Sequence, residues 1–255
     1  MLSKNQIKFL NALKQKKIRE EHQLFVAEGN KIIPELLDSS IRVKQIYAIE
    51  PAIEKLKRKN HTEYILVKPA ELERISSLTT PNEMLAVCEV PQSELNIQNL
   101  KNKLTLVLDT IKDPGNLGTI IRIADWFGIE EIVCSFQSTD AFNPKVVQAT
   151  MGSIARVKIH YTDLIQFFHT NQQVLKLPVY GALLEGENIY SHKLMQTALI
   201  MIGNESKGIS PELISFVTHK ITIPSFSHFK SIQGETESLN AAIATAVICS
   251  EFRRT

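Results

Sequence analysis

The sequence has no apolar run near the ~20 residues that a membrane-spanning helix needs, which argues against an integral membrane protein. Its basic start has no long apolar core, which excludes a secretory signal, although a basic, amphipathic start could be mistaken for a transit peptide. Only three cysteines occur, Cys88, Cys134 and Cys249, each alone in an apolar run. Isolated cysteines of this kind predict buried, reduced thiols and a cytoplasmic location.

Signatures of metal and nucleotide sites are missing as well. No pair of Cys or His residues has zinc-ligand spacing, so we expect no metal. The turn at residues 115–118 reads G-N-L-G and not G-x-G-x-x-G, and no phosphate-loop pattern includes Lys207 and Gly208. A nicotinamide oxidoreductase is therefore only a distant alternative.

The formal net charge is only +2, which is weak support for a polyanionic partner, but the charges are unevenly distributed. Six Lys and Arg residues and no acidic residue occur up to Arg19, with apolar residues at helical spacing among them. A solvated helix face and a phosphate-contacting helix both explain this pattern. In the second interpretation the phosphate contacts come from Lys14, Lys16, Lys17 and Arg19.

Strand-like and helix-like segments alternate along the chain. The strand-like segments are 24–29, 43–49, 63–67, 84–90, 104–110, 130–135, 155–159, 177–184, 198–203 and 220–224. Helical patterns lie between most of them, and those at 51–60 and 69–77 open with a proline, which the first turn of a helix tolerates. This alternation predicts an α/β fold with a mainly parallel sheet and helices on both faces.

The polar stretch PQSELNIQNLKNK at residues 91–103 is the best candidate for a linker. We therefore expect a small N-terminal α/β domain at residues 1–95, a linker at 96–103 and a larger C-terminal α/β domain at 104–255. Ligands of parallel sheets bind beyond the carboxyl ends of the strands. The polar residues that follow strands in the larger domain are therefore the candidate site.

The first such strand end is the stretch LDTIKDPGNLGTIIRIADWFG at residues 108–128. Asn116 could cap the following helix, and Gly118 could allow close packing. Arg122 lies one helical turn after Gly118 among three isoleucines, and an arginine in that setting needs a partner or a function. A structural ion pair and a functional role both stay open for it.

Two further strand ends carry polar residues. Residues 203–208 read GNESKG, and Glu205 taken alone would usually be a solvated loop residue. In the segment after Pro224, a helix rich in alanine begins near Ser238. Tight packing of a terminal helix explains the alanines, but it does not explain Ser238 and Asn240 at the start of that helix.

Together these segments resemble the SpoU/TrmH family of RNA ribose 2′-O-methyltransferases, within the SPOUT superfamily. NLGTIIR at 116–122 resembles the family's first motif, GNESKGI at 203–209 the second, and IP at 223–224 with SLNAAIATA at 238–246 the third. The three motifs occur in the family's order. The front stretch at 16–37, KKIREEHQLFVAEGNKIIPELL, resembles the family's substrate-binding domain, a small fold similar to some ribosomal proteins.

The resemblance implies that the C-terminal domain is an α/β trefoil-knot methyltransferase fold, which the strand pattern alone would not predict. It also implies S-adenosylmethionine as cofactor and a homodimer whose interface includes the helix from Ser238. The N-terminal α/β domain would bind RNA. The residues expected to bind the cofactor are Leu183, Gly203, Asn204, Gly208, Ile223 and Leu239.

The resemblance gives Arg122 a function. Methyl transfer to a ribose 2′-hydroxyl needs that oxygen to become more anionic. A guanidinium keeps its proton above pH ~12, so it is a poor base but a good stabiliser of the forming alkoxide. The remaining catalytic positions that the resemblance implies, which would orient Arg122, the ribose and the cofactor, are Asn116, Glu205, Ser238 and Asn240. The group that takes the proton stays open.

The expected function is S-adenosylmethionine-dependent methylation of a ribose 2′-hydroxyl in RNA. Ribosomal RNA is the expected substrate, because the front domain resembles that of the family's ribosomal-RNA members. A transfer-RNA 2′-O-methyltransferase and a non-catalytic RNA-binding or ribosome assembly factor are the alternatives.

The chain departs from the family's pattern in one segment. SFSHFKSIQGETE, residues 225–237, is longer than the usual link within the third motif. This insertion could be a lid, a surface loop, or a source of RNA contacts, since aromatic rings stack on bases. The residues that would make such contacts are Phe226, His228, Phe229 and Lys230.

Overall fold

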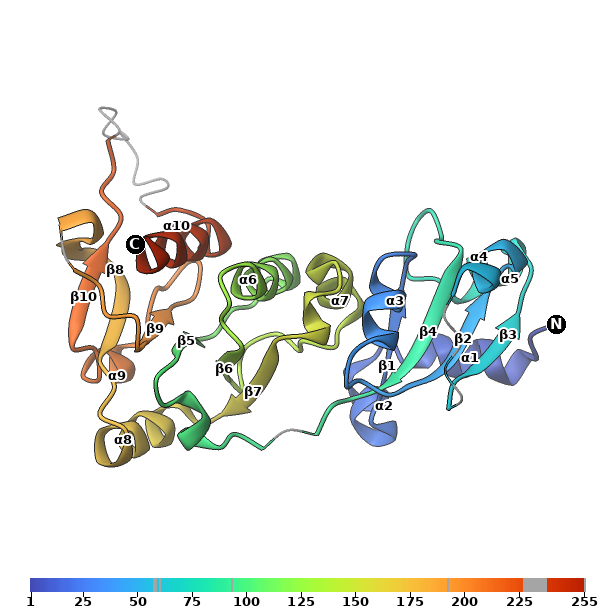
Figure 1. Cartoon of the computed structure of the whole chain (residues 1–255), viewed down its shortest axis with the longest axis horizontal. Helices are drawn as coiled ribbons and strands as arrows, with labels where there is room; N and C mark the ends of the chain where they lie inside the picture. Colours follow the sequence, from blue (N-terminus) through green and yellow to red (C-terminus); the bar gives the residue numbers. More distant parts are fainter. Residues whose placement is uncertain (57–58, 60, 93, 192, 227–237, 255) are drawn as a thin grey trace. The chain divides into compact units, whose positions relative to one another are not determined.

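A computed structural model describes residues 1–56, 59, 61–92, 94–191, 193–226 and 238–254. The chain forms two compact units, which Figure 1 shows as ribbons. The first unit is Met1–Gln92 with Asp140–Arg156, and the second is Ser93–Thr139 with Val157–Thr255. This division differs from the expected domains in the segment Asp140–Arg156, which the sequence pattern placed in the larger domain.

The segment Asp140–Arg156 groups with the first unit because it packs on strand β1 (Leu24–Glu28). Helix α7 (Pro144–Thr150) contacts β1, and the Phe142 ring lies 4.9 Å from the ring of Phe25. Burial of these side chains joins segments more than 100 residues apart in sequence. A linear pattern of strands and helices contains no sign of such a contact.

Strands and helices alternate in the first unit. Its further elements are α1 (Lys4–Ala12), α2 (Lys16–His22), α3 (Ile32–Leu37), β2 (Val43–Ala48), α4 (Glu50–Lys55), β3 (Glu63–Leu66), α5 (Pro69–Ile75), β4 (Met84–Glu89) and the 3₁₀ turn η2 (Ser153–Ala155). The sheet order is β1-β4-β2-β3, with β4 antiparallel to both neighbours and β2 parallel to β3. The expectation of a mainly parallel sheet is wrong for this unit, because β4 runs antiparallel between β1 and β2.

Local sequence explains where these helices begin. The Ser3 hydroxyl accepts a hydrogen bond from the Gln6 amide, and the Gln6 side chain accepts one from the Ser3 amide, so α1 starts with a capping box. Helices α4 and α5 both carry a proline in their first turn, where its missing amide proton costs no hydrogen bond. The four expected strands of this unit are confirmed.

The second unit is an α/β structure with a fully parallel sheet. Its elements are η1 (Ile97–Leu100), β5 (Leu104–Leu108), α6 (Pro114–Trp126), β6 (Glu131–Ser135), β7 (Lys158–Thr162), α8 (Leu164–Val174), β8 (Val179–Asn188), η3 (Ile189–Ser191), β9 (Ala198–Ile202), α9 (Pro211–Ile214), β10 (His219–Thr222) and α10 (Ala241–Arg253). The sheet order is β10-β8-β9-β5-β6-β7, and every neighbouring pair is parallel. The expected α/β fold class is confirmed, and strand β7 begins three residues later than expected. The trefoil knot stays a prediction.

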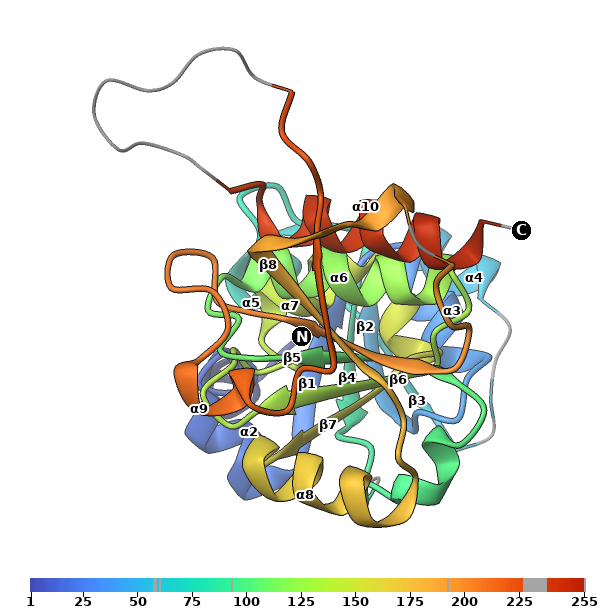
Figure 2. The same ribbon diagram turned by 90° about the vertical axis from the view of Figure 1, so that its left-hand side faces the viewer.

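Helices cover both faces of this parallel sheet. Helices α6 and α10 lie side by side on one face, and α8 and α9 lie on the other, as Figures 1 and 2 agree. Strands β5, β6 and β9 are buried along their whole length, which explains their continuous apolar sequence. Ala241 and Ala242 are buried within this unit, so their small side chains serve the packing of α10 on the chain itself.

Strands β5 and β9 are neighbours and end at the same edge of the sheet. The Asp109 amide donates to the carbonyl oxygen of Ile202 at 2.9 Å, and the Ser210 amide donates to the Asp109 carboxylate at 2.7 Å. These bonds join the loop after β5 to the loop after β9. Among the described residues, no helix has the length and apolar character to cross a membrane.

Candidate active site

The loop after β9, residues 203–210, has a fixed backbone. Asn204 and Gly208 exchange two backbone hydrogen bonds of 2.9 Å, and Gly208 has a φ of +70°, which glycine adopts without strain. A Cβ atom on Gly203 would lie 2.2 Å from the carbonyl carbon of Gly208, so a larger residue cannot fit there. Both glycines are thus explained by backbone geometry.

The side chain of Asn204 holds this loop to the rest of the site. Its Oδ1 atom accepts from the Ser206 and Lys207 amides at 3.0 Å each. Its Nδ2 atom donates to the Thr110 carbonyl oxygen at 2.9 Å and to Glu205 Oε2 at 3.2 Å. Asn204 therefore shapes its own loop and fixes the Glu205 carboxylate.

Helices α6 and α10 contribute one asparagine each. Asp113 caps α6 by accepting from the Asn116 amide at 2.7 Å, and this leaves the Asn116 side chain free for other contacts. Asn240 caps α10, since its Oδ1 atom accepts from the amides of Ala242 and Ile243 at 3.0 and 3.2 Å. Asn240 is therefore the N-cap residue of α10.

Hydrogen bonds connect all three expected motifs. Asn240 Nδ2 donates to Asn116 Oδ1 at 2.9 Å, and Asn116 Nδ2 donates to Glu205 Oε1 at 2.9 Å. With the bond from Asn204 to the same carboxylate, four side chains form one chain of hydrogen bonds. Each amide in the chain from Asn240 to Glu205 is oriented by its neighbour, so the half-buried Glu205 carboxylate is held in one position.

Arg122 lies on the exposed side of α6. Its side chain is exposed, and it makes no hydrogen bond or ion pair with any described residue. The isoleucines at 120 and 121 beside it are fully buried, whereas Trp126, one turn further on, is 84% exposed. The structural ion pair that the sequence left open for Arg122 has no counterpart in the described part of the chain.

A cavity of about 770 Å³ lies beside the loop at 203–210. All six residues expected to bind a cofactor line it: Leu183, Gly203, Asn204, Gly208, Ile223 and Leu239. Two of the expected catalytic residues, Glu205 and Ser238, line it as well. Asn116, Asn240 and Arg122 do not line it, although the first two are hydrogen-bonded to Glu205 directly or through each other.

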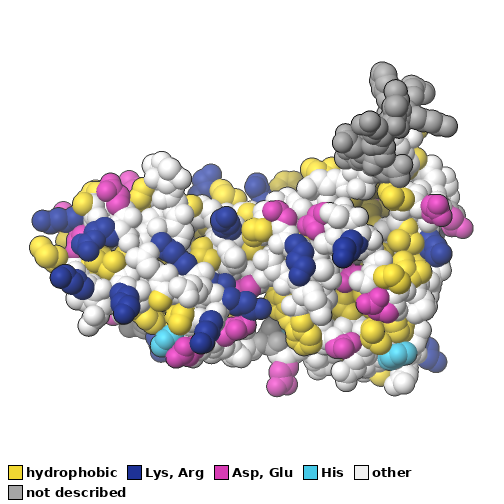
Figure 3. All heavy atoms as spheres, turned by 180° about the vertical axis from the view of Figure 1, so that it is seen from behind, with side chains coloured by type: hydrophobic (Ala, Val, Ile, Leu, Met, Phe, Trp, Pro, Cys, Tyr) yellow, Lys and Arg dark blue, Asp and Glu magenta, His cyan; other side chains and the backbone are white. Residues whose placement is uncertain are grey.

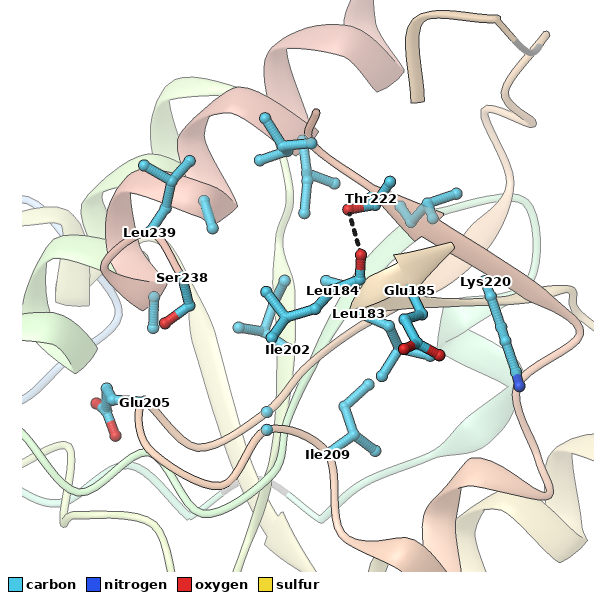
Figure 4. Close-up of a pocket in the computed structure, with 18 of the residues that line it drawn as sticks. Leu183, Leu184, Glu185, Ile202, Glu205, Ile209, Lys220, Thr222, Ser238 and Leu239 are labelled. Atoms are coloured by element: carbon cyan, nitrogen blue, oxygen red, sulfur yellow. Dashed lines mark hydrogen bonds between the residues drawn. The ribbon is translucent and has the colours of Figure 1, made fainter. Parts of the chain in front are cut away.

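Figure 4 shows how polar groups are distributed in this cavity. Glu205 and Ser238 lie at one end, and Glu185 and Lys220 lie at the other, with Ile202 and Ile209 in the apolar wall between them. Sequence reasoning missed Glu185 and Lys220. The sequence pattern gave little sign of Glu185, because the strand was expected to end at residue 184. Strand β8 continues four residues further, and the exposed Glu185 lies in that extension.

The four basic residues expected to contact phosphate differ in their surroundings. Lys16 and Lys17 are exposed, and Lys16 lies 3.6 Å from Glu20. Lys14 is half-buried and donates to Asn11 Oδ1 and to the Ser76 carbonyl oxygen at 2.6 and 2.7 Å, and burial lowers its pKa. In Figure 3, Lys and Arg side chains are spread over the visible face of the first unit.

Arg19 is different from these lysines, because it is only 3% exposed. Its Nη2 atom lies 2.5 Å from Asp140 Oδ2, and its Nη1 atom donates to the carbonyl oxygens of Leu13 and Lys14 at 3.0 and 2.8 Å. The expectation that Arg19 contacts phosphate is corrected here. Its guanidinium is used inside the protein, joining α2 to the segment that begins at Asp140.

The insertion at 225–237 is described only at its first two residues. Phe226 is exposed and lines the 770 Å³ cavity. The expected RNA contacts of His228, Phe229 and Lys230 lie outside the described residues. Within the described part of the chain, no group of three or more His, Cys, Asp or Glu side chains could hold a metal ion.

Both parts of the chain match known protein families. Residues 103–250 match the model of the SpoU rRNA Methylase family, and residues 4–86 match that of the MRM3-like substrate binding domain. The chain is 26% identical to the 23S rRNA (guanosine(2553)-2′-O)-methyltransferase RlmP of Bacillus subtilis, with 98% of this chain and 97% of that protein covered.

Solved structures give the same result. A structure from Porphyromonas gingivalis assigned to the TrmH family of RNA methyltransferases has 38% identity and a TM-score of 0.89, covering 99% of this chain and 98% of that one. An AdoMet-bound rRNA methyltransferase from Sinorhizobium meliloti has 28% identity and a TM-score of 0.86, covering 99% and 95%. The resemblance carried by the three motifs is confirmed, and the chain belongs to the SpoU rRNA methylase family.

Proposed function

We propose that this protein transfers a methyl group from S-adenosylmethionine to a ribose 2′-hydroxyl of ribosomal RNA. The observation that carries the proposal is the hydrogen-bonded chain Asn240–Asn116–Glu205–Asn204, which ends beside the 770 Å³ cavity. It unites the three family motifs at one edge of the parallel sheet. This edge is where α/β proteins bind their ligands.

The cavity fits S-adenosylmethionine in size and in chemistry. Its volume of about 770 Å³ lies within the ~300–1,000 Å³ of ligand pockets. Gly203 lets the backbone of Gly208 and Ile209 pack directly against it, which holds the loop that lines the cavity in its shape. The apolar wall at Leu183, Ile223 and Leu239 suits the uncharged parts of the cofactor, and Asn204 and Gly208 belong to the loop beside them.

When bound, the cofactor supplies an electrophilic methyl group on a positively charged sulfur. The chain's own residues must position the ribose and stabilise its oxygen as it becomes anionic. Arg122 suits this role because its guanidinium is exposed, uses none of its donors within the described chain, and stays protonated. It lies six residues after Asn116, or about 9 Å along α6.

The other polar residues orient the reacting groups. Asn116 and Asn240 hold Glu205 in place, so the carboxylate has one fixed direction toward the cavity. Ser238 lies at the same end of the cavity as Glu205 and can contact the ribose or the cofactor (Figure 4). Substituting one oxyanion donor typically costs ~2.7–4 kcal/mol of transition-state stabilisation.

Ribosomal RNA is the better-supported substrate. The Bacillus subtilis relative is named for 23S rRNA and matches over nearly the full length of both chains. The first unit matches a substrate-binding domain, and its exposed Lys16 and Lys17 can approach phosphates. A transfer-RNA substrate is the alternative, and one structure concerning 2′-OH methylation of tRNA covers only 59% of this chain.

We also propose a homodimer, a knotted second unit and a cytoplasmic location. Ile243 on α10 is 54% exposed although it is apolar, and a second copy would cover it. Ile243→Asp should therefore yield a monomer in sedimentation, and a dimer of the wild-type mass would contradict the idea.

The knot is inferred from family membership. The location is supported by three buried, unpaired thiols, and burial raises the pKa of Cys249 to about 12.

Mass-spectrometric mapping of 2′-O-methyl groups in total RNA tests the function directly. Cells with and without the gene are compared, and the gene is then restored with wild-type protein or with Glu205→Gln. Loss of a single ribosomal-RNA methyl group, restored only by the wild type, is the expected result. Loss of a transfer-RNA methyl group supports the alternative substrate, and unchanged RNA in all strains supports an assembly factor.

A further inference from the structure

A second cavity, of about 280 Å³, lies in the second unit at the carboxyl ends of β5, β6 and β7. Its walls come from four separate segments: 109–110 after β5, 135–137 at the end of β6, 162–165 between the end of β7 and the start of α8, and 210–213 at the start of α9. The methyl-transfer mechanism above makes no use of these residues. Its position at the carboxyl edge of a parallel sheet is typical of a ligand site.

The two cavities lie on the two sides of one loop. Residues 203–209 line the larger cavity, and Ser210, the next residue, lines the smaller one. The Asn204 side chain reaches across and donates to the carbonyl oxygen of Thr110, which also lines the smaller cavity. The loop at 203–210 and its bond to Thr110 therefore connect the two cavities.

The inner wall of the smaller cavity is rigid and already hydrogen-bonded. Asp109 is only 3% exposed, and its two oxygens accept from the Thr110 hydroxyl at 2.8 Å and the Ser210 amide at 2.7 Å. Ser135 Oγ accepts from the Thr110 amide at 2.9 Å. These polar groups already have hydrogen-bond partners within the protein, so they form a rigid floor beneath a ligand in the cavity.

The rim combines one aromatic ring with two carboxylates, of which Asp163 caps α8 by accepting from the Gln166 amide at 3.0 Å. Phe136 is 61% exposed and Ile165 is 41% exposed, and both are apolar groups held at the mouth of the cavity. The carboxylates of Asp163 and Glu212 are exposed beside them, and the Glu212 carboxylate has no hydrogen bond or ion pair with any described residue. Such a rim attracts a flat ring that carries hydrogen-bond donors, while a phosphate attached to that ring stays in solvent.

We propose that this cavity binds one unpaired nucleobase of the RNA substrate, with the base stacked on Phe136 and its amino group donating to Glu212 or Asp163. Single-stranded bases are recognised in this way, by aromatic stacking and by hydrogen bonds to their edges. Guanine, adenine and cytosine carry an amino group, whereas uracil offers only a ring N–H. The cavity should therefore favour an amino-bearing base over uracil. This inference rests on the proposed function.

Nucleotide binding to the whole protein tests the site without methyl transfer. The protein is labelled at isoleucine δ1 methyl groups and titrated with GMP, AMP, CMP and UMP, and the Ile165 signal is followed by NMR. The three amino-bearing monophosphates should shift this signal at lower concentration than UMP. Phe136→Ala should weaken their binding roughly 5- to 150-fold, the range for one stacked base. Val174→Ala, at an exposed apolar site elsewhere on α8, should leave it unchanged.

Glu212→Gln should reduce the preference for amino-bearing bases over UMP, whereas Glu94→Gln, at another exposed carboxylate of the same unit, should not. Thermal unfolding of each variant controls for folding. If no monophosphate shifts Ile165, or if Phe136→Ala binds as tightly as Val174→Ala, the subsite is wrong even when the protein methylates RNA. If the monophosphates bind as expected but RNA mapping finds no lost methyl group, the base site stands and the methyltransferase function fails.

Discussion

Two arginines, one in each unit, both stand in stretches that the sequence marks as functional, and the structure gives them opposite surroundings. Arg19 is 3% exposed and is bonded to Asp140 and to two carbonyl oxygens. Arg122 is exposed and makes no hydrogen bond or ion pair with the described residues. A buried guanidinium must be paired to offset its lost hydration, whereas an exposed one keeps its donors for a ligand. Substituting Arg122 should therefore lower the rate of methyl transfer, whereas substituting Arg19 should lower the stability of the fold.

The largest effect is expected from Arg122→Ala. Single-turnover methyl transfer should drop by roughly 10²–10³ if Arg122 acts like one oxyanion donor, and by more if it also positions the phosphate. The unfolding temperature and the affinity for S-adenosylmethionine should stay close to wild type, because Arg122 has no described partner and does not line the cavity. An early-melting variant that methylates at the wild-type rate when folded would remove Arg122 from the mechanism.

Arg19→Ala should instead lower the stability of the protein and leave its activity unchanged. It removes the guanidinium that donates to Asp140 Oδ2 and to two carbonyl oxygens, and breaking a buried pair typically costs ~3–5 kcal/mol. We expect about 3 kcal/mol, the low end of that range, because the Asp140 side chain is 17% exposed. Denaturant unfolding measures this loss. The rate of methyl transfer per folded molecule should be unchanged. A stable but inactive variant would show that Arg19 contributes to RNA binding or catalysis.

The exposed lysines near Arg19 test whether the first unit still contacts phosphate. Reversing Lys16 and Lys17 to Glu should weaken RNA binding and lower the salt slope of the binding constant by about 1 for each lysine that binds a phosphate. The matched control reverses Lys101 and Lys193, which are exposed in the second unit. An unchanged slope in the Lys16 and Lys17 variant would mean that this helix is only a solvated face.

The contrast between the arginines also shows what the sequence could predict. The motifs that follow strands pointed to Gly203, Glu205 and Leu239, and all three line one cavity at the carboxyl edge of the parallel sheet, while their roles stay predictions. The burial of Arg19 could not be predicted, since Asp140 is 121 residues away in sequence. The same reason hid the smaller cavity, whose walls come from four separate segments.

The direction of each strand could not be predicted from the sequence pattern either. Alternating strands and helices predicted a parallel sheet, and this is correct for the second unit. In the first unit, β4 lies between β1 and β2 and runs antiparallel to both. Periodicity reports which residues are buried on a strand, but the direction of a strand depends on which neighbours it pairs with.

Lysine replacements separate the effect of charge from that of geometry, and Arg19→Lys should give the smallest effect of all. Arg19→Lys keeps a positive charge near Asp140 but removes hydrogen bonds to the carbonyl oxygens of Leu13 and Lys14, so unfolding should become easier by only ~0.5–1.5 kcal/mol for each of these bonds. Arg122→Lys should recover little activity over Arg122→Ala, because a point charge cannot reproduce the two-pronged contact of a planar guanidinium. Denaturant unfolding and single-turnover rates on both variants form the measurement. Charge then supplies part of the role of Arg19, whereas the planar geometry of the guanidinium is required for that of Arg122. Full activity in Arg122→Lys would show that Arg122 provides only a general positive field.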